Sequence, residues 1–185
     1  MFVSCFSFID YEFFCGGAIL NGWQILTAAH CTFNKNSAEI AIIPLLSYTR
    51  HFYGKPNTWK EKGYQVKHIV NHEDYNSTTW DNDIAIMTLT EPLDLSQYSA
   101  IDLEPFHQKS HLENESCSVA GWGLNQFGFD LLGFDRRRLS KINVPIVNYT
   151  ICHQKHEDNH NEQSCSVTHL HICAGPPSVG SVCLE

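Results

Sequence analysis

The chain has 185 residues, of which 43% are hydrophobic and 12% aromatic, and its formal net charge at pH 7 is −8. This length and composition are those of a folded protein with one core or two small barrels, and they exclude a disordered chain. The acidic charge argues against a nucleic-acid-binding protein, which needs a basic surface, and no apolar run reaches the ~18 residues of a membrane span. We therefore expect neither nucleic acid nor a membrane among its partners.

Short runs rich in Ile, Val, Phe and Tyr recur along the chain and are separated by turn residues, a pattern typical of β-strands. The first run covers MFVSCFSFIDYEFF, and the next are Phe13–Leu20, Trp23–Leu26, Glu39–Leu45, Tyr64–Val70, Asp83–Leu89, Cys117–Gly121 and Leu139–Val144. A polar, histidine-rich stretch at Asn148–His160 is the best helical candidate, and residues 124–135 predict an irregular surface loop. Strands at this spacing predict an all-β sandwich or a set of barrels.

Eight cysteines lie at wide, irregular spacings without a Cys-x-x-Cys pair, so neither a zinc ribbon nor a thioredoxin-like redox site is expected. Such spacing favours structural disulfides in an oxidising compartment. Three Asn-x-Ser/Thr sequons agree with that compartment and make Asn76, Asn114 and Asn148 candidate glycosylation sites. We expect a secreted protein, although the first residues predict a strand and not a signal peptide.

The stretch Thr27-Ala28-Ala29-His30-Cys31 contains the first candidate functional residue. Two alanines leave space beside the imidazole of His30, and Cys31 would anchor the backbone behind it by pairing with Cys15, sixteen residues earlier. Closing such a loop stabilises the fold by ~3 kcal/mol in the chain-entropy model. Taken alone, this pattern favours a histidine that is simply part of the core.

The stretch Asp81-Asn82-Asp83-Ile84-Ala85-Ile86 contains the second candidate. Asp83 opens an apolar strand, so its carboxylate would enter the protein interior and would need a partner such as an imidazole N–H. An Asp that holds a His in one tautomer is the orienting part of a triad that activates a nucleophile. The alternative is an Asp that only caps a turn at the start of a strand.

Four stretches, in this order, resemble blocks of the trypsin/chymotrypsin-like serine proteases. FCGGAILNGWQILTAAHC is similar to the histidine block, NHEDYNSTTWDNDIAIMTL to the aspartate block, CSVAGWG to the Gly-Trp-Gly turn of the second barrel, and ICAG to the segment before the serine block. The resemblance spans residues 3–185. It implies two six-stranded Greek-key β-barrels, the second incomplete in this chain, within one protease domain over residues 1–185.

The resemblance also implies roles for individual residues. His30 matches the general base, and Asp83 matches the carboxylate that orients it. Ser181 falls at the floor of the specificity pocket, where a neutral residue favours apolar or aromatic substrate side chains over Lys or Arg. The implied disulfides are Cys15–Cys31 and Cys152–Cys173, the second of them next to the substrate pocket.

The family's nucleophilic serine lies in a Gly-Asp-Ser-Gly-Gly-Pro segment that would follow Cys183, and the given sequence ends at Glu185. We expect these 185 residues to lack both the N-terminal activation segment and the C-terminal nucleophile segment, and so not to cleave peptides as given. Cys117 and Cys183 then lose their expected partners, whereas Cys5 and Cys165 match no cysteine of the family.

Two hypotheses follow. The first, which the intact His30 and Asp83 motifs favour, is a fragment or truncated form of a secreted serine endopeptidase that is active when complete. The second is an inactive pseudoprotease that acts as a binding or decoy protein. Both predict a monomer whose partners are protein or peptide substrates and protease inhibitors, with neither a cofactor nor a metal.

A different hypothesis places a metal on Cys152-His153-x-x-His156-x-x-x-His160, with His169 and His171, because His156 and His160 would share one face of a helix. A solvated polar helix explains the same residues, and no His-Glu-x-x-His motif is present. Separately, Arg136-Arg137-Arg138 is either a cleavage site for another protease or solvated surface charge.

Overall fold

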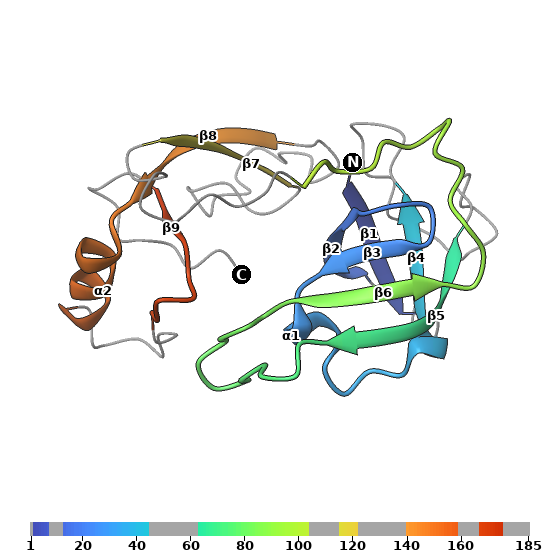
Figure 1. Cartoon of the computed structure of the whole chain (residues 1–185), viewed down its shortest axis with the longest axis horizontal. Helices are drawn as coiled ribbons and strands as arrows, with labels where there is room; N and C mark the ends of the chain where they lie inside the picture. The colour runs from blue at the N-terminus through green and yellow to red at the C-terminus, as the bar shows by residue number, and fades with distance from the viewer. Residues whose placement is uncertain are drawn as a thin grey trace, which may run out of the picture.

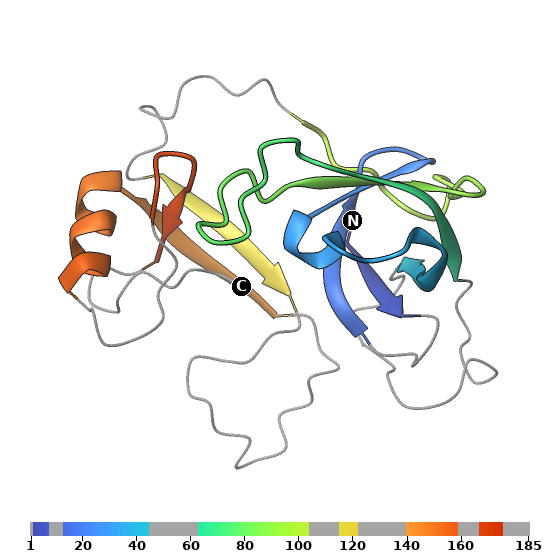
Figure 2. The same ribbon diagram turned by 90° about the horizontal axis from the view of Figure 1, so that it is seen from below.

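The structure is a computed structural model that describes residues 2–7, 13–44, 63–103, 115–121, 140–158 and 167–175. The described part is built mainly of β-strands, which confirms the predicted all-β fold. A barrel formed by the first half of the chain lies beside a smaller sheet formed by the second half (Figures 1 and 2). The loop predicted at 124–135, the arginines at 136–138, Asn114, His160, Cys165, Ser181 and Cys183 lie outside the described residues.

Six antiparallel strands close into the first barrel in the order β1-β2-β3-β6-β5-β4. Their bounds are β1 Phe2–Ser7, β2 Phe13–Ile19, β3 Gln24–Thr27, β4 Ile40–Pro44, β5 Tyr64–Asn71 and β6 Ala85–Leu89. Each strand overlaps a run of apolar residues that predicted it. A closed barrel has no free sheet edge, so the loops at its ends start from fixed positions.

The predicted start of the sixth strand at Asp83 is wrong by two residues. Asn82 adopts a left-handed backbone conformation with φ 56°. The Ile84 N–H donates to the Asn82 carbonyl at 2.7 Å, which makes a tight turn before the ladder with β3 begins at the pair Thr27 and Ala85. Asp83 therefore lies in the loop before the barrel wall.

The interior of the barrel is a single apolar cluster. Burial alternates along β3 and β6, because successive side chains of a strand point to opposite faces. The largest fully buried apolar side chains are Ile19, Ile25, Ile40, Ile42, Val66, Met87 and Leu89. Each contributes about 1.5–3 kcal/mol of hydrophobic stabilisation, so the barrel is a firm support for the residues at its end.

The second half forms a three-stranded antiparallel sheet in the order β7-β8-β9, with β7 Ser116–Gly121, β8 Ser140–Val147 and β9 Cys173–Ala174. Helix α2, Tyr149–Asp158, follows β8 at the position where the sequence predicted a helix. Within the described residues this second barrel is incomplete, as predicted. Its buried cluster is small and consists of Cys152, Val167 and Cys173.

Two short helices were not predicted. They are α1, Ala29–Thr32, directly after β3, and the 3-10 helix η1, Ser37–Glu39. Among the described residues, no helix has the length and apolar character needed to cross a membrane.

Candidate active site

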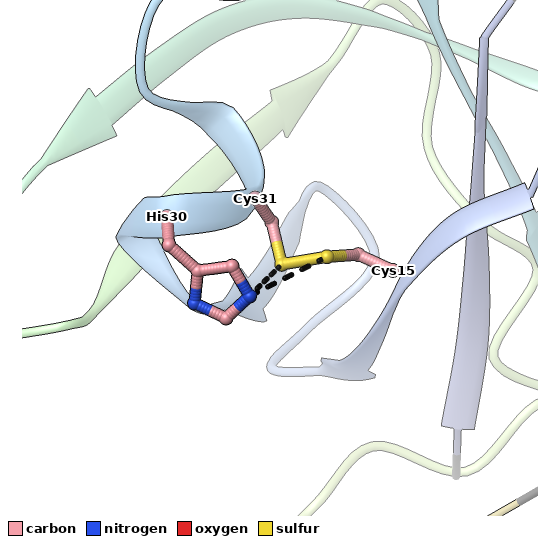
Figure 3. A group of neighbouring side chains, drawn as sticks. All are labelled: Cys15, His30 and Cys31. Carbon is pink, nitrogen blue, oxygen red and sulfur yellow. Dashed lines mark hydrogen bonds between the residues drawn. A yellow bond between two sulfur atoms is a disulfide. The ribbon is translucent and has the colours of Figure 1, made fainter. Parts of the chain in front are cut away.

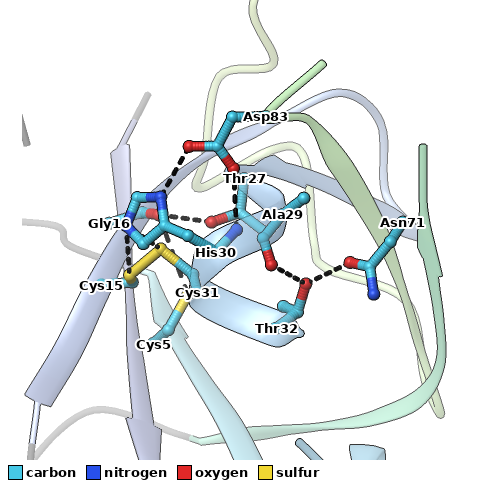
Figure 4. Close-up of a disulfide and its surroundings, with 10 residues drawn as sticks. All are labelled: Cys5, Cys15, Gly16, Thr27, Ala29, His30, Cys31, Thr32, Asn71 and Asp83. Carbon is cyan, nitrogen blue, oxygen red and sulfur yellow. Dashed lines mark hydrogen bonds and ion pairs between the residues drawn. A yellow bond between two sulfur atoms is a disulfide. The ribbon is translucent and has the colours of Figure 1, made fainter. Parts of the chain in front are cut away.

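His30 lies on α1, a single helical turn that is too short to be stable on its own. Contacts with the barrel hold this turn in place. Two of its own residues, Ala29 and Thr32, are buried, and the Thr32 hydroxyl donates to the side-chain oxygen of Asn71 on β5 at 2.5 Å (Figure 4). Ala29, the second of the two alanines before His30, is fully buried, so this position leaves no room for a larger side chain.

A disulfide between Cys15 and Cys31 joins α1 to β2 (Figure 4). Nearby, the Thr27 hydroxyl at the end of β3 donates to the Gly16 carbonyl of β2 at 2.8 Å. The disulfide joins the two cysteines that the sequence paired. The backbone of the histidine is thus fixed on both sides.

Asp83 accepts two hydrogen bonds from His30. Its Oδ1 accepts the backbone N–H at 2.7 Å, and its Oδ2 lies 2.6 Å from the ring Nδ1 (Figure 4). An ionised carboxylate can only accept, so Nδ1 carries the imidazole proton and Nε2 keeps its lone pair. The side chains of His30 and Asp83 are 31% and 19% exposed, so the pair is accessible at one edge. The structure therefore brings together the two residues that the sequence singled out.

The Nε2 atom of His30 faces the disulfide, at 3.3 Å from the Cys31 sulfur and 4.0 Å from the Cys15 sulfur (Figure 3). These three residues are the group with metal-compatible spacing among the described residues. Both sulfurs are used in the disulfide, however, and metal binding requires thiolates. While this bond is intact, the group offers the single nitrogen of His30.

Trp80 flanks the imidazole, with ring centroids 4.7 Å apart and planes tilted by 36°. Trp80 was not predicted from the sequence, although it lies three positions before Asp83 in the same motif. Trp80 shields one side of His30 from water, so it belongs to the site.

The negative charge of Asp83 also affects the pKa of Tyr75 in the same loop. Burial raises the pKa of Tyr75, and the negative charge of Asp83 raises it further. The Tyr75 ring meets the ring of Phe33 edge-on, at 5.4 Å between centroids.

The trypsin family model matches residues 3–183 of this sequence. The chain belongs to the trypsin family. A trypsin from Phaedon cochleariae is 30% identical over 170 residues, which cover 90% of this chain and 58% of that protein. Trypsin zeta of Drosophila melanogaster is 30% identical over 167 residues, covering 90% and 55%. Mannan-binding lectin serine protease 1 of Rattus norvegicus is 30% identical over 187 residues, covering 96% and 25%. The chain thus spans little more than half the length of these two trypsins.

The second half of this trypsin-family chain contains the other implied disulfide. Cys152 on α2 is bonded to Cys173 on β9, and both are buried. The metal hypothesis is wrong about Cys152, because a sulfur in a disulfide is not a ligand. Among the described residues, Cys152, His153, His169 and His171 form no metal-binding group.

The remaining candidate residues have simpler surroundings. Asn76 is exposed in the loop before Asp83, and Asn148 is half-buried at the start of α2, where its Oδ1 accepts the Thr150 N–H at 2.8 Å. Cys5 and Cys117 are free thiols, the first buried and the second half-buried. The pocket residue Ser181 lies outside the described part of this trypsin-family chain.

Proposed function

We propose that this chain is part of a secreted serine endopeptidase, in which His30 is the general base and Asp83 the residue that orients it. The observation that carries the proposal is the pair of hydrogen bonds from His30 to Asp83, at 2.7 Å and 2.6 Å. They leave the Nε2 lone pair as the proton acceptor, which is what a serine hydroxyl needs to become a nucleophile.

In the proposed reaction, Nε2 of His30 takes the proton of a serine hydroxyl as its oxygen attacks the substrate carbonyl. The carboxylate of Asp83 stabilises the imidazolium, which then gives the proton to the leaving amine. No Gly-Asp-Ser segment occurs in these 185 residues, so the proposal places the nucleophile in sequence beyond Glu185. Ser181 would favour apolar or aromatic substrate side chains.

The second candidate is a pseudoprotease that binds substrates or inhibitors without cutting them. Such a protein would need the folded barrels but no nucleophile, because triad members act as a unit and the base alone gives almost no catalysis. Under either proposal the partners are proteins or peptides, and the protein is a monomer with N-glycans at some of its sequons.

The intact mass of the deglycosylated native protein, with a peptide map of its C-terminus, separates the two. We expect a mass well above the 21.0 kDa of this chain, with peptides that read through Cys183 into a Gly-Asp-Ser segment. His30→Ala in that protein should abolish peptide cleavage, whereas His68→Ala, which changes an exposed histidine of β5, should not. A mass of 21.0 kDa with Glu185 as the last residue would contradict the endopeptidase and favour the pseudoprotease.

A further inference from the structure

Asp81 connects the loop of the candidate site to the second half of the chain. Its Oδ1 accepts a hydrogen bond from the Thr168 hydroxyl, and its Oδ2 accepts one from the Thr79 hydroxyl at 3.0 Å. Nδ1 of His171 lies 3.8 Å from Oδ1. The carboxylate side chain is 22% exposed, so it has exchanged most of its water contacts for these partners. The chemistry proposed above makes no use of it.

The backbone on both sides of Asp81 is left-handed, which is unfavourable for Trp80 but common for Asn82. Trp80 has φ 62° and Asn82 has φ 56°, in the left-handed region that bulky side chains such as Trp rarely adopt. Such a conformation persists only where the surrounding contacts hold it. Inside the loop, the backbone N–H of Trp80 donates to the backbone carbonyl of Asn76 at 2.7 Å. The side-chain NH₂ of Asn82 donates to the backbone carbonyl of Asp74 at 3.0 Å. The carboxylate of Asp81 adds an anchor outside the loop.

The turn that carries Thr168 is itself well supported. Val167 is buried in the cluster around the Cys152–Cys173 disulfide, and the Tyr149 hydroxyl donates to the Val167 carbonyl at 3.4 Å. The Thr168 oxygen accepts the Leu170 N–H at 3.2 Å and lies 3.1 Å from Nδ1 of His171, and its hydroxyl donates to Asp81. The loop of the candidate site is therefore tied to a part of the second half that is held in place.

We propose that Asp81 is a positioning residue: its bond to Thr168 holds the segment Trp80–Asn82 in its strained conformation and thereby keeps Trp80 and Asp83 against His30. One residue separates Asp81 from Asp83, and Trp80 precedes it directly, so a change in its backbone moves both neighbours of the imidazole. The consequence for catalysis rests on the proposed function, but the effect on His30 is measurable without any catalysis.

The test is the solvent-exchange rate of the His30 Nδ1 proton, followed by NMR in the folded full chain with its disulfides intact. Thr168→Val removes the hydroxyl and keeps the shape, whereas Thr168→Ser keeps the hydroxyl and is the matched control. Asp81→Ala removes the acceptor, and Asp74→Ala removes one charge from an exposed position of the same loop.

We expect Thr168→Val and Asp81→Ala each to speed this exchange about tenfold, as for the loss of one hydrogen bond to a charged group. The two controls should stay within about twofold of the unchanged chain. The double variant should be no faster than Asp81→Ala alone, because Asp81→Ala already removes the contact with Thr168. In the complete protein, kcat should fall in Thr168→Val with little change in KM.

Equal exchange rates in Thr168→Val and Thr168→Ser would overturn the proposal, even if both variants were less stable to heat, because Asp81 would then have only a structural role. If Thr168→Val does not fold, the exchange rates of the His30 Nδ1 proton in Asp81→Ala and Asp74→Ala are compared instead. Equal rates in these two variants would overturn the proposal. A complete protein without peptidase activity would contradict the proposed function, but it would leave the exchange result valid.

Discussion

Asp83→Asn alters the chemistry of the candidate site with almost no change of shape. In the native structure one carboxylate oxygen accepts the His30 backbone N–H and the other accepts Nδ1–H. An asparagine has one oxygen, and its NH₂ group cannot accept a hydrogen bond. If the oxygen keeps the backbone bond, the NH₂ group faces Nδ1. The imidazole then avoids two opposed donors by moving its proton to Nε2.

The expected size of the effect differs between activity and stability. With its proton on Nε2, His30 has no lone pair to offer to a serine hydroxyl. In the Ser-His-Asp mechanism this wrong tautomer lowers kcat about 10⁴-fold, which corresponds to about 5.4 kcal/mol of barrier. The free energy of unfolding should fall far less, by about 1.5 kcal/mol, which is the lower end for a hydrogen bond to a charged group that is partly exposed.

Two assays measure these effects separately. The ¹⁵N shifts of the His30 ring report which nitrogen carries the proton, and they need no activity. The value of kcat is then compared in the complete protein between Asp83→Asn and the matched control Asp74→Asn, which removes a charge from the same loop. If Asp83→Asn keeps its proton on Nδ1, or retains kcat within about tenfold of the unchanged enzyme, the carboxylate does not set the tautomer and the reasoning is refuted.

Three further predictions concern stability. Replacing both cysteines of Cys15–Cys31 by alanine should lower the free energy of unfolding by ~3 kcal/mol, from the separation of 16 residues, and urea denaturation with a loss under ~1 kcal/mol would contradict this. Burial raises the pKa of Cys5 from 9.0 to about 12, so the folded chain keeps a proton that the unfolded chain loses. Stability should therefore fall as pH rises from 9 towards 12, by at most ~1.4 kcal/mol per unit from this group, and Cys5→Ala should show a shallower slope in alkaline urea titrations. Hydrogen bonds from Ser96 and Gln97 lower the pKa of Asp94, so its contribution is present above its unfolded pKa and lost as pH falls through the lowered folded value. In acid titrations, Asp94→Asn should lose stability less steeply than the unchanged chain, and parallel curves would refute this.

The barrel strands were predictable from the sequence because each one is a short apolar run bounded by turn residues. The alternation of buried and half-buried residues along β6 is a local pattern, and it needs no knowledge of the neighbouring strands. Helix α1 was not predictable in this way. It has four residues, and its position depends on the bond from Thr32 to Asn71, 39 residues away in sequence.

The candidate site likewise has residues that local sequence patterns indicate and contacts that depend on distant residues. His30 and Asp83 could be picked out because each lies in a short stretch whose composition already limits its surroundings. The bond of Asp81 to Thr168 joins residues 87 positions apart, and nothing in either stretch indicates the other. The contact of Trp80 with His30 was missed for a related reason, since it depends on the left-handed backbone at positions 80 and 82.

The arrangement around α1 bears on which function the chain serves. Two strands of a closed barrel and one loop fix this single turn: β2 through the disulfide to Cys31, β5 through Asn71 to Thr32, and the loop before β6 through Asp83 to His30. A histidine held at this many points needs little reorganisation when charge develops on it, which is what a general base requires. Binding a partner without reaction makes no such demand on a carboxylate that must give up water to reach the imidazole. The cost of holding Asp83 there is therefore better explained by catalysis, and this is why we favour the endopeptidase over the pseudoprotease.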